Sequence, residues 1–456
     1  MTGRAWLGLV LVLLAGAVAA GGWLRCEGVR PTLTGPERLH VGRSGTSVRV
    51  EAVDHESGIR QLELRVVQRD REQSIGKIAR PGNLGLGGAR GVPEHIEAVL
   101  NVGELGLREG EARLVANVSD WSWRRWLTGN ETSLEIPVNV DLTKPRVSVE
   151  TGQTYVERGG AGAVVYRVSE GTQRDGVLVG DVFFPGRPFP GDAKRRIALF
   201  AIPRDVAPAP RIVVLAADLA GNEASASWPV NLEERVFDDV RIDLNSAFLQ
   251  AKVRELAESV GVEEPDALGA FRKINKETRA DNEAKIRSII AKSADEPLFE
   301  GAFVQMRNSA VTSRFAERRS YYYDDVKVSE AIHYGYDLAS TAGAPIEASN
   351  RGRVLFAGEL GIYGNCVILD HGLGLTSLYG HLAQIDVKEG ALVEKNERLG
   401  RSGSSGLAGG DHLHFAMLVG GSYVDPTEWW DAKWVAEKVK SRLGGGETTA
   451  AATTAP

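Results

Sequence analysis

The stretch that decides the fold of the C-terminal part reads HYGYDLAS at residues 333–340, and two later stretches belong with it, SLYGHL at residues 377–382 and GDHLHFAM at residues 410–417. Only eight histidines occur in the 456 residues, and five of them fall between His333 and His414. Around them, short alternations of apolar and polar residues with many glycines predict β structure from about residue 300 to 426. The histidines are therefore expected on or beside strands.

The spacing within these stretches predicts which side chains lie together. On an extended strand, residues i and i+2 face the same way, so His412 and His414 are expected to project from one face of a sheet. His333 and Asp337 are four residues apart, which also fits one face of a helix. The Tyr-Gly-Tyr between them forms helix poorly, so a strand or loop is expected there.

Histidines and an aspartate in this arrangement suggest a metal site. Two imidazoles and one carboxylate are a complete protein set for a catalytic zinc, because they leave the fourth tetrahedral position for water. A histidine with a carboxylate four residues away is more commonly a surface pair, and His-x-His also occurs on strands without metal. The combination of both motifs with a third histidine in a glycine-bounded β segment favours the metal site.

The three stretches and the intervening APIEASNRGRVLFAGELGIYGNCVILDHGLGLTSLYGHL resemble, in this order, the lysostaphin/LytM-type metallopeptidases, over roughly Ser313 to Pro426. The resemblance implies one Zn²⁺ per chain and assigns a role to each of seven residues. The implied ligands are His333, Asp337 and His414; the implied catalytic histidines, which orient the water and stabilise the oxyanion, are His381 and His412; and the residues that resemble substrate-binding positions of the cleft are Tyr363 and Asn365. For the YGN segment, a turn between two strands is the alternative interpretation.

Two positions depart from the pattern of that family. Ala416 stands where a glutamate is frequent, and Asn396 stands where a glycine often turns the chain. Neither removes an implied ligand, and asparagine tolerates a left-handed turn well. The change at Ala416 therefore bears on the substrate cleft and leaves the metal site intact. His371 is expected at a strand end, and Arg318 and Arg319 are interpreted as solvated or structural.

The predicted fold class is multidomain and mainly β. Residues 29–140 and 141–236 read as two blocks of short strands that end alike, with an aspartate followed by Gly-Asn before the last strand: Asp120 with Gly129-Asn130, and Asp218 with Gly221-Asn222. This predicts two tandem Ig-like β-sandwich modules. The Gly-Asn pairs are expected in tight turns with positive φ.

The blocks are followed by a change of composition. Residues 237–299 show apolar residues at helical spacing and predict a helical linker packed against a neighbour; a hypothesis is that it covers the cleft until a partner moves it. Residues 300–434 are the expected antiparallel β peptidase domain. Residues 435–456 are the end of a short helix and a tail with too few apolar residues to fold.

The N-terminal residues 1–28 read as an export signal. Arg4 precedes an apolar run over residues 6–24, and Arg25 follows. Ala17-Val18-Ala19 suits a signal peptidase, whereas the apolar run also suits an uncleaved anchor in the inner membrane, and both stay open. The expected location is the periplasm or cell envelope, with membrane contact only through this segment. Cys26 and Cys366 are the only cysteines and are expected as free thiols.

The net charge of the chain bears on which class of molecule it binds. A net charge of −6 gives no electrostatic footprint for a nucleic acid. The resemblance and the export signal together imply a zinc endopeptidase that cuts peptide cross-links of bacterial peptidoglycan. The alternative is a non-catalytic LytM-fold scaffold that regulates a cell-wall amidase, although such relatives typically lack a ligand. The β modules are a candidate binding site for a regulatory protein.

Overall fold

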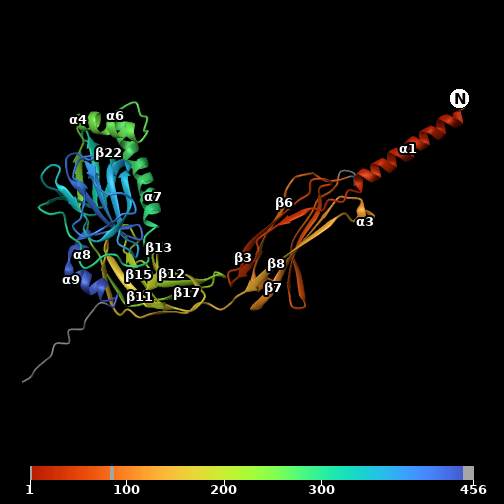
Figure 1. The fold of residues 1–456 in the computed structure, drawn as a ribbon, viewed down its shortest axis with the longest axis horizontal. Coiled ribbons are helices and arrows are strands. Elements are labelled where there is room, and N and C mark those ends of the chain that lie inside the picture. Colours follow the sequence, from red (N-terminus) through yellow and green to blue (C-terminus); the bar gives the residue numbers. More distant parts are fainter. Residues whose placement is uncertain (1–2, 83–86, 445–456) are drawn as a thin grey trace, which may run out of the picture. The chain divides into compact units, whose positions relative to one another are not determined.

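The computed structural model describes residues 3–82 and 87–444, and it is mainly β (Figure 1). Most of the tail predicted as unfolded, residues 445–456, lies outside the described residues. The chain divides into two compact units, Met1–Pro145 with Ala217–Glu223, and Arg146–Ala216 with Ala224–Pro456.

Unit 1 begins with helix α1 (Gly3–Arg25). Among the residues that the structure describes, no helix is both long enough and apolar enough to cross a membrane. Two sheets follow, one in the order β1-β3-β6 and one in the order β2-β8-β7-β4-β5. Their strands are β1 (Thr32–Thr34), β2 (Leu39–Val41), β3 (Thr46–Val53), β4 (Ile59–Gln68), β5 (Arg71–Ala79), β6 (Glu94–Leu100), β7 (Gly110–Asp120) and β8 (Glu131–Val140), with the short helices α2 (Val102–Leu105) and α3 (Arg124–Leu127) between them.

The core of unit 1 follows from two-residue periodicity. In β7 the residues Ala112, Leu114, Ala116 and Val118 are buried and alternate with more exposed ones. Since successive side chains of a strand point to opposite faces, this face packs against the other sheet in one hydrophobic core. The structure thus contains the strands expected for residues 29–140. Their assignment to an Ig-like module stays a prediction.

The two Asp and Gly-Asn motifs make the same pair of hydrogen bonds, although Asp120 and Asn130 are ten residues apart and Asp218 and Asn222 only four. Asp120 accepts hydrogen bonds from the backbone N–H of Asn130 (2.7 Å) and from its side-chain amide (2.8 Å). Asp218 accepts the same two from Asn222, at 2.9 and 3.0 Å. The preceding glycine has positive φ in both turns, as expected, but the asparagines do not. Asparagine is therefore present for its hydrogen bonds to the aspartate.

Most of the second β block belongs to unit 2, and the block forms sheets in the orders β14-β15-β11-β9, β13-β12-β16-β17 and β10-β18. Its strands are β9 (Val147–Val149), β10 (Thr154–Glu157), β11 (Ala161–Val168), β12 (Thr172–Val179), β13 (Val182–Pro185), β14 (Arg187–Phe189), β15 (Asp192–Ala201), β16 (Ile212–Asp218), β17 (Glu223–Ala226) and β18 (Val230–Glu233). Its buried residues, such as Phe184 and Phe200, belong to the same core cluster as those of the C-terminal domain. This block therefore shares one core with the segments that follow it.

The segment predicted as a helical linker is built into unit 2. After strand β19 (Asp239–Asp243) it contains α4 (Ser246–Phe248), η2 (Leu249–Val253), α5 (Arg254–Ser259), α6 (Ala267–Lys273), η3 (Ile274–Thr278) and α7 (Arg279–Ile290). Asn245 and Asp266 cap two of these helices by accepting backbone N–H groups. Phe271, Ile274 and Ile286 lie in the core cluster of unit 2. The segment is thus a packed wall of the domain.

The C-terminal domain centres on an antiparallel sheet in the order β20-β23-β31-β27-β26-β25-β29, with β32 paired to β31. Two three-stranded sheets adjoin it, β19-β21-β22 and β24-β30-β28. The remaining elements are β20 (Ala310–Ser313), β21 (Glu317–Tyr323), β22 (Val326–His333), β23 (Tyr336–Ala339), β24 (Pro345–Glu347), β25 (Gly352–Glu359), η4 (Gly361–Tyr363), β26 (Asn365–Asp370), β27 (Leu375–Leu382), β28 (Gln384–Ile385), β29 (Leu392–Val393), β30 (Arg398–Arg401), β31 (Leu413–Val419), β32 (Ser422–Val424), α8 (Pro426–Trp430), α9 (Ala432–Trp434) and η5 (Val435–Lys440). Every residue of β27 and β31 is buried, so these two strands fix the centre of the domain.

Candidate metal centre

Strand register brings the first and last of the histidine-bearing stretches together. His333 ends β22, Asp337 lies in β23, and Asp337 is directly opposite His414 on β31. Between His333 and Asp337 the chain passes close to the ring of His414. A Cβ atom on Gly335 would lie 2.6 Å from that ring, so only glycine fits there.

Three side-chain atoms of these residues converge. His333 Nε2 lies 2.9 Å from Asp337 Oδ1 and 3.0 Å from His414 Nδ1, and His414 Nδ1 lies 3.1 Å from Asp337 Oδ1. All three residues are buried. They form a His-Asp-His group able to hold a metal ion.

A hydrogen bond on the far side of the His333 ring orients its donor atom. His333 Nδ1 lies 3.0 Å from the carbonyl oxygen of Arg314, to which only an N–H can donate, so in the neutral ring Nε2 carries the lone pair. Burial alone would raise the pKa of the Asp337 carboxyl, but the charge and hydrogen bonds of the neighbouring histidines outweigh burial and hold that pKa well below its usual range. Asp337 is therefore a carboxylate aimed at the two imidazoles.

The donor set fits zinc. Ligand atoms 2.0–2.2 Å from a tetrahedral ion are separated by roughly 3.3–3.6 Å, and the three observed separations are 2.9–3.1 Å. A small outward movement of the rings would admit the ion. Two imidazoles with one carboxylate also leave a fourth position for water.

The structure places His381 and His412 beside this group. Their ring centroids are 4.9 Å apart, and His412 Nε2 lies 3.5 Å from Asp337 Oδ1. His381 Nδ1 donates to the carbonyl oxygen of Ser405, and His412 Nδ1 to that of Gly410, both at 2.8 Å. Each neutral ring therefore has its lone pair on Nε2.

An irregularity of the sheet sets the direction of His381. Its φ is +63°, and the register between β26 and β27 shifts by one residue at this point. A bulge re-aims a side chain, and a left-handed backbone at a non-glycine residue is a local strain that surrounding structure must hold. Burial lowers the pKa of His381 to about 3, with the neighbouring histidines adding to the effect. His381 is thus held neutral in the metal-free protein.

Arg319 is a residue of this centre whose contact the sequence did not reveal. It donates from Nη2 to Asp337 Oδ2 at 2.9 Å and lies 3.5 Å from Glu317 Oε2. Arg318 has an exposed side chain, in agreement with a solvated role. Because Glu317, Arg319 and Tyr321 alternate along one face of β21, the two-residue period was the signal that separates Arg319 from Arg318.

The two residues of the YGN segment have different surroundings. Tyr363 is buried and lines the cleft of the metal centre, and its hydroxyl donates to Glu283 Oε1 at 2.8 Å. Asn365 does not line this cleft, and its side-chain amide donates to the carbonyl oxygen of Leu382 at 3.0 Å. His371 is also absent from the cleft. It lies buried just beyond the end of β26, where its ring bonds Ser377 and the backbone of Arg351.

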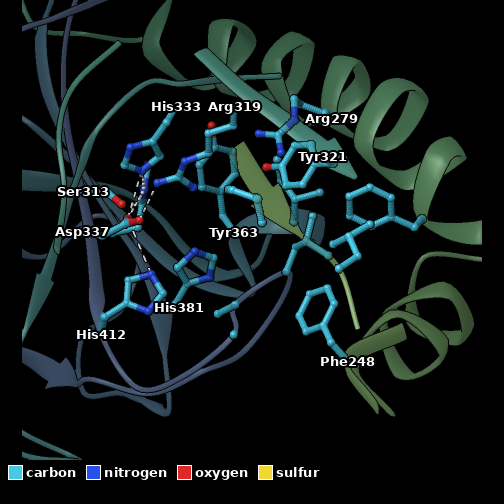
Figure 2. Close-up of a pocket in the computed structure, with 18 of the residues that line it drawn as sticks. Phe248, Arg279, Ser313, Arg319, Tyr321, His333, Asp337, Tyr363, His381 and His412 are labelled. Atoms are coloured by element: carbon cyan, nitrogen blue, oxygen red, sulfur yellow. Dashed lines mark hydrogen bonds and ion pairs between the residues drawn. The ribbon is translucent and has the colours of Figure 1, made fainter. Parts of the chain in front are cut away.

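The cleft has a volume of about 590 Å³ and extends from the metal centre to the helical segment (Figure 2). One side carries the candidate metal ligands and the two neighbouring histidines: His333, Asp337, His414, His381 and His412. The other side is formed by β19, the helices and β21. These residues include Ile242, Leu244, Phe248, Phe271, Arg279 and Tyr321. The helical segment therefore shapes the cleft and leaves it hollow.

Comparisons with known proteins bear on the same region. The model of peptidase family M23 matches residues 331–426. The DD-carboxypeptidase/endopeptidase Mpg of Neisseria meningitidis serogroup B is 39% identical over 95 residues, which are 21% of this chain and 22% of that protein. The peptidoglycan DD-endopeptidase ShyA of Vibrio cholerae is 35% identical over 115 residues, 25% of this chain and 26% of that protein. This chain therefore spans about a quarter of the length of these curated relatives.

Solved structures of the same kind are similar to parts of the chain. A putative peptidase M23 from Pseudomonas aeruginosa covers 59% of this chain and 93% of its own, with 24% identity and a TM-score of 0.35. The catalytic domain of lysostaphin from Staphylococcus simulans covers 29% of this chain and 98% of its own, with 25% identity and a TM-score of 0.25. On the match of the family model and the identities to these curated relatives, residues 331–426 are a peptidase family M23 domain.

Proposed function

We propose that this chain is a zinc-dependent endopeptidase that hydrolyses peptide cross-links of bacterial peptidoglycan outside the cytoplasm. The observation that carries the proposal is the convergence of the donor atoms of His333, Asp337 and His414 within 3.1 Å of one another. Two further imidazoles present Nε2 in the same cleft. These are the groups that metal-assisted amide hydrolysis requires.

The three ligands would hold the zinc, which supplies a polarised water with a pKa lowered to about 7. His381 and His412 handle the proton and the charge. A neutral imidazole accepts the proton of the attacking water at Nε2, and a protonated one donates from Nε2 to the oxygen of the scissile amide as negative charge develops there. Arg319 fixes Asp337 by binding Oδ2, which leaves Oδ1 facing the two histidine ligands.

Two observations support peptidoglycan as the substrate and export as the route. Relatives of the domain are named peptidoglycan DD-endopeptidase, and residues 6–24 form an apolar run preceded by Arg4. Export through this segment is part of the proposal. Binding of a regulatory protein by residues 29–236 stays a prediction.

The second candidate function is a non-catalytic scaffold that regulates a cell-wall amidase. A scaffold does not need the ligands or the paired imidazoles. Since His333, Asp337, His381, His412 and His414 are all present and lie in one cleft, hydrolysis is favoured.

The test uses the full chain, with zinc content measured by mass spectrometry and muropeptide release from purified sacculi measured by chromatography. We expect one zinc per chain and release of cross-linked fragments. His333→Ala should lose both, whereas His40→Ala, a change in unit 1, should lose neither. A wild-type chain that releases no more fragments than His333→Ala contradicts the peptidase proposal. If that chain instead stimulates an amidase, the scaffold function holds.

A further inference from the structure

The cleft contains a second charged group besides the metal centre. Arg279 begins α7 and lines the same cleft as the histidines, and Figure 2 shows its side chain extending from the helix into the group of cleft-lining residues. It comes from the helical segment, outside the residues matched by the family model.

The partners of Arg279 are neutral. Its Nη2 donates to the side-chain oxygen of Asn275 at 2.8 Å, and its Nε lies 3.3 Å from both the side-chain and the backbone oxygen of Asn275. Asn275 is 2% exposed, and its own amide nitrogen donates to Ser329 Oγ at 2.8 Å. This second bond fixes the direction of the asparagine oxygen. Arg279 is thus held in place by an anchored amide.

Among the residues that the structure describes, no carboxylate forms an ion pair with Arg279. Within residues 3–82 and 87–444, no Asp or Glu oxygen lies within 4.0 Å of its guanidinium, and its Nη1 has no hydrogen-bond partner. Glu283, one turn further along α7, accepts the hydroxyl of Tyr363 instead. Arg319, the other arginine of the cleft, is bound by Glu317 and Asp337. Arg319 is therefore already paired with carboxylates, whereas Arg279 has only neutral hydrogen-bond partners and can bind an incoming anion.

The surroundings of Arg279 suit a peptide. Phe248, Phe271 and Tyr321 supply apolar surface on the same side of the cleft. A half-buried guanidinium in such a site binds a carboxylate through two parallel N–H···O bonds, which are stronger and more directional than those of an ammonium group. Withdrawal from water also makes an unpaired charge costly, so an incoming anion relieves that cost.

We propose that Arg279 is a specificity-determining residue that binds a free carboxylate of the substrate peptide, so that the chain prefers cross-links carrying an acidic residue near the cut bond. This rests on the proposed peptidase function. Cross-links through diaminopimelate offer such a carboxylate, whereas a bridge of glycines offers none on its side chains. The expected substrate class is therefore the acidic stem peptide.

The test compares two muropeptide dimers cross-linked through diaminopimelate, one with the free carboxylate and one with that group amidated. A hydrogen-bonded charge pair contributes about 10- to 100-fold in binding. For the zinc-loaded full chain we expect kcat/KM to be higher by this factor for the free carboxylate, mainly through KM. Arg279→Gln should remove the preference, and Arg279→Lys should keep part of it.

Arg272→Gln is the matched control, because Arg272 is exposed on α6 and does not line the cleft. It should leave the preference unchanged. Zinc content and thermal unfolding of each variant check that the fold is intact. The proposal is overturned if wild type treats both dimers alike, or if Arg279→Gln keeps the wild-type preference.

A binding measurement separates this inference from the proposed function. Calorimetry of the same dimers with the chelator-treated full chain does not require turnover. A preference for the carboxylate that depends on Arg279, without cleavage by the zinc-loaded chain, supports the inference and refutes the peptidase. Cleavage of both dimers with equal affinity supports the peptidase and refutes the inference.

Discussion

Replacing Arg319 by glutamine should destabilise the metal-free protein strongly. The side chain of Arg319 is 18% exposed, and its two carboxylate partners are 12% (Asp337) and 9% exposed (Glu317). Removing the Arg319 guanidinium leaves the buried carboxylates of Glu317 and Asp337 without their positively charged partner. Breaking a buried ion pair in this way costs about 3–5 kcal/mol, so we expect the free energy of unfolding of unit 2 to fall by that amount.

The adjacent residue gives a matched control. Arg318 lies next along β21, but its side chain is 54% exposed and its partner Asp239 is 78% exposed. Arg318→Gln should therefore change the stability by only about 0–1 kcal/mol. Both variants are unfolded with urea in the presence of a chelator and again with zinc. Zinc places another positive charge beside Asp337, so the loss for Arg319→Gln should be smaller with zinc.

One result would refute this reasoning. If Arg319→Gln and Arg318→Gln lose equal stability in the chelator, the contact between Arg319 and Asp337 does not contribute as the geometry implies. An equal loss with and without zinc would separately refute the link between Arg319 and the metal centre.

Three further predictions concern other parts of the chain. Burial lowers the pKa of His371 from 6.5 to about 4, so between these pH values the unfolded state binds more protons than the folded state. The contribution of neutral His371 to the free energy of unfolding should be fully present above about pH 6.5 and should fall by up to about 3 kcal/mol toward pH 4. His371→Gln should flatten this pH dependence, as measured by urea unfolding. Leu114→Ala, in the core of unit 1, should lower the free energy of unfolding of that unit by about 2–5 kcal/mol. The zinc content of the variant should equal that of the wild type, because the candidate metal ligands belong to unit 2. A lower zinc content would contradict this expectation. Cys26 is exposed, whereas Cys366 is buried and burial raises the pKa of its thiol. A thiol reagent should therefore modify Cys26 alone in the native chain and both cysteines in urea. Modification of both cysteines in the native chain would contradict the burial of Cys366.

Much of the site could be predicted because its signals are local. The His-x-His pair depends on two-residue periodicity, which can be recognised from spacing, whereas the close approach of Gly335 to the His414 ring became visible only in the structure. The strands of the two β blocks were predictable for the same reason, since the alternation of apolar and polar residues along a strand is visible in neighbouring positions of the sequence. The direction of His381 was not, because it depends on a bulge and a left-handed residue that no spacing reveals.

The sequence by itself predicted which side chains could bind a metal, that they lie on strands, and that helices precede them. Only the tertiary structure decided what surrounds these groups. It placed Arg319 against Asp337, left Asn365 outside the cleft, and turned the segment predicted as a linker into the cleft wall that carries Arg279. The physical reason is that spacing records the faces of one element, whereas contacts between elements depend on register and packing across distant parts of the chain.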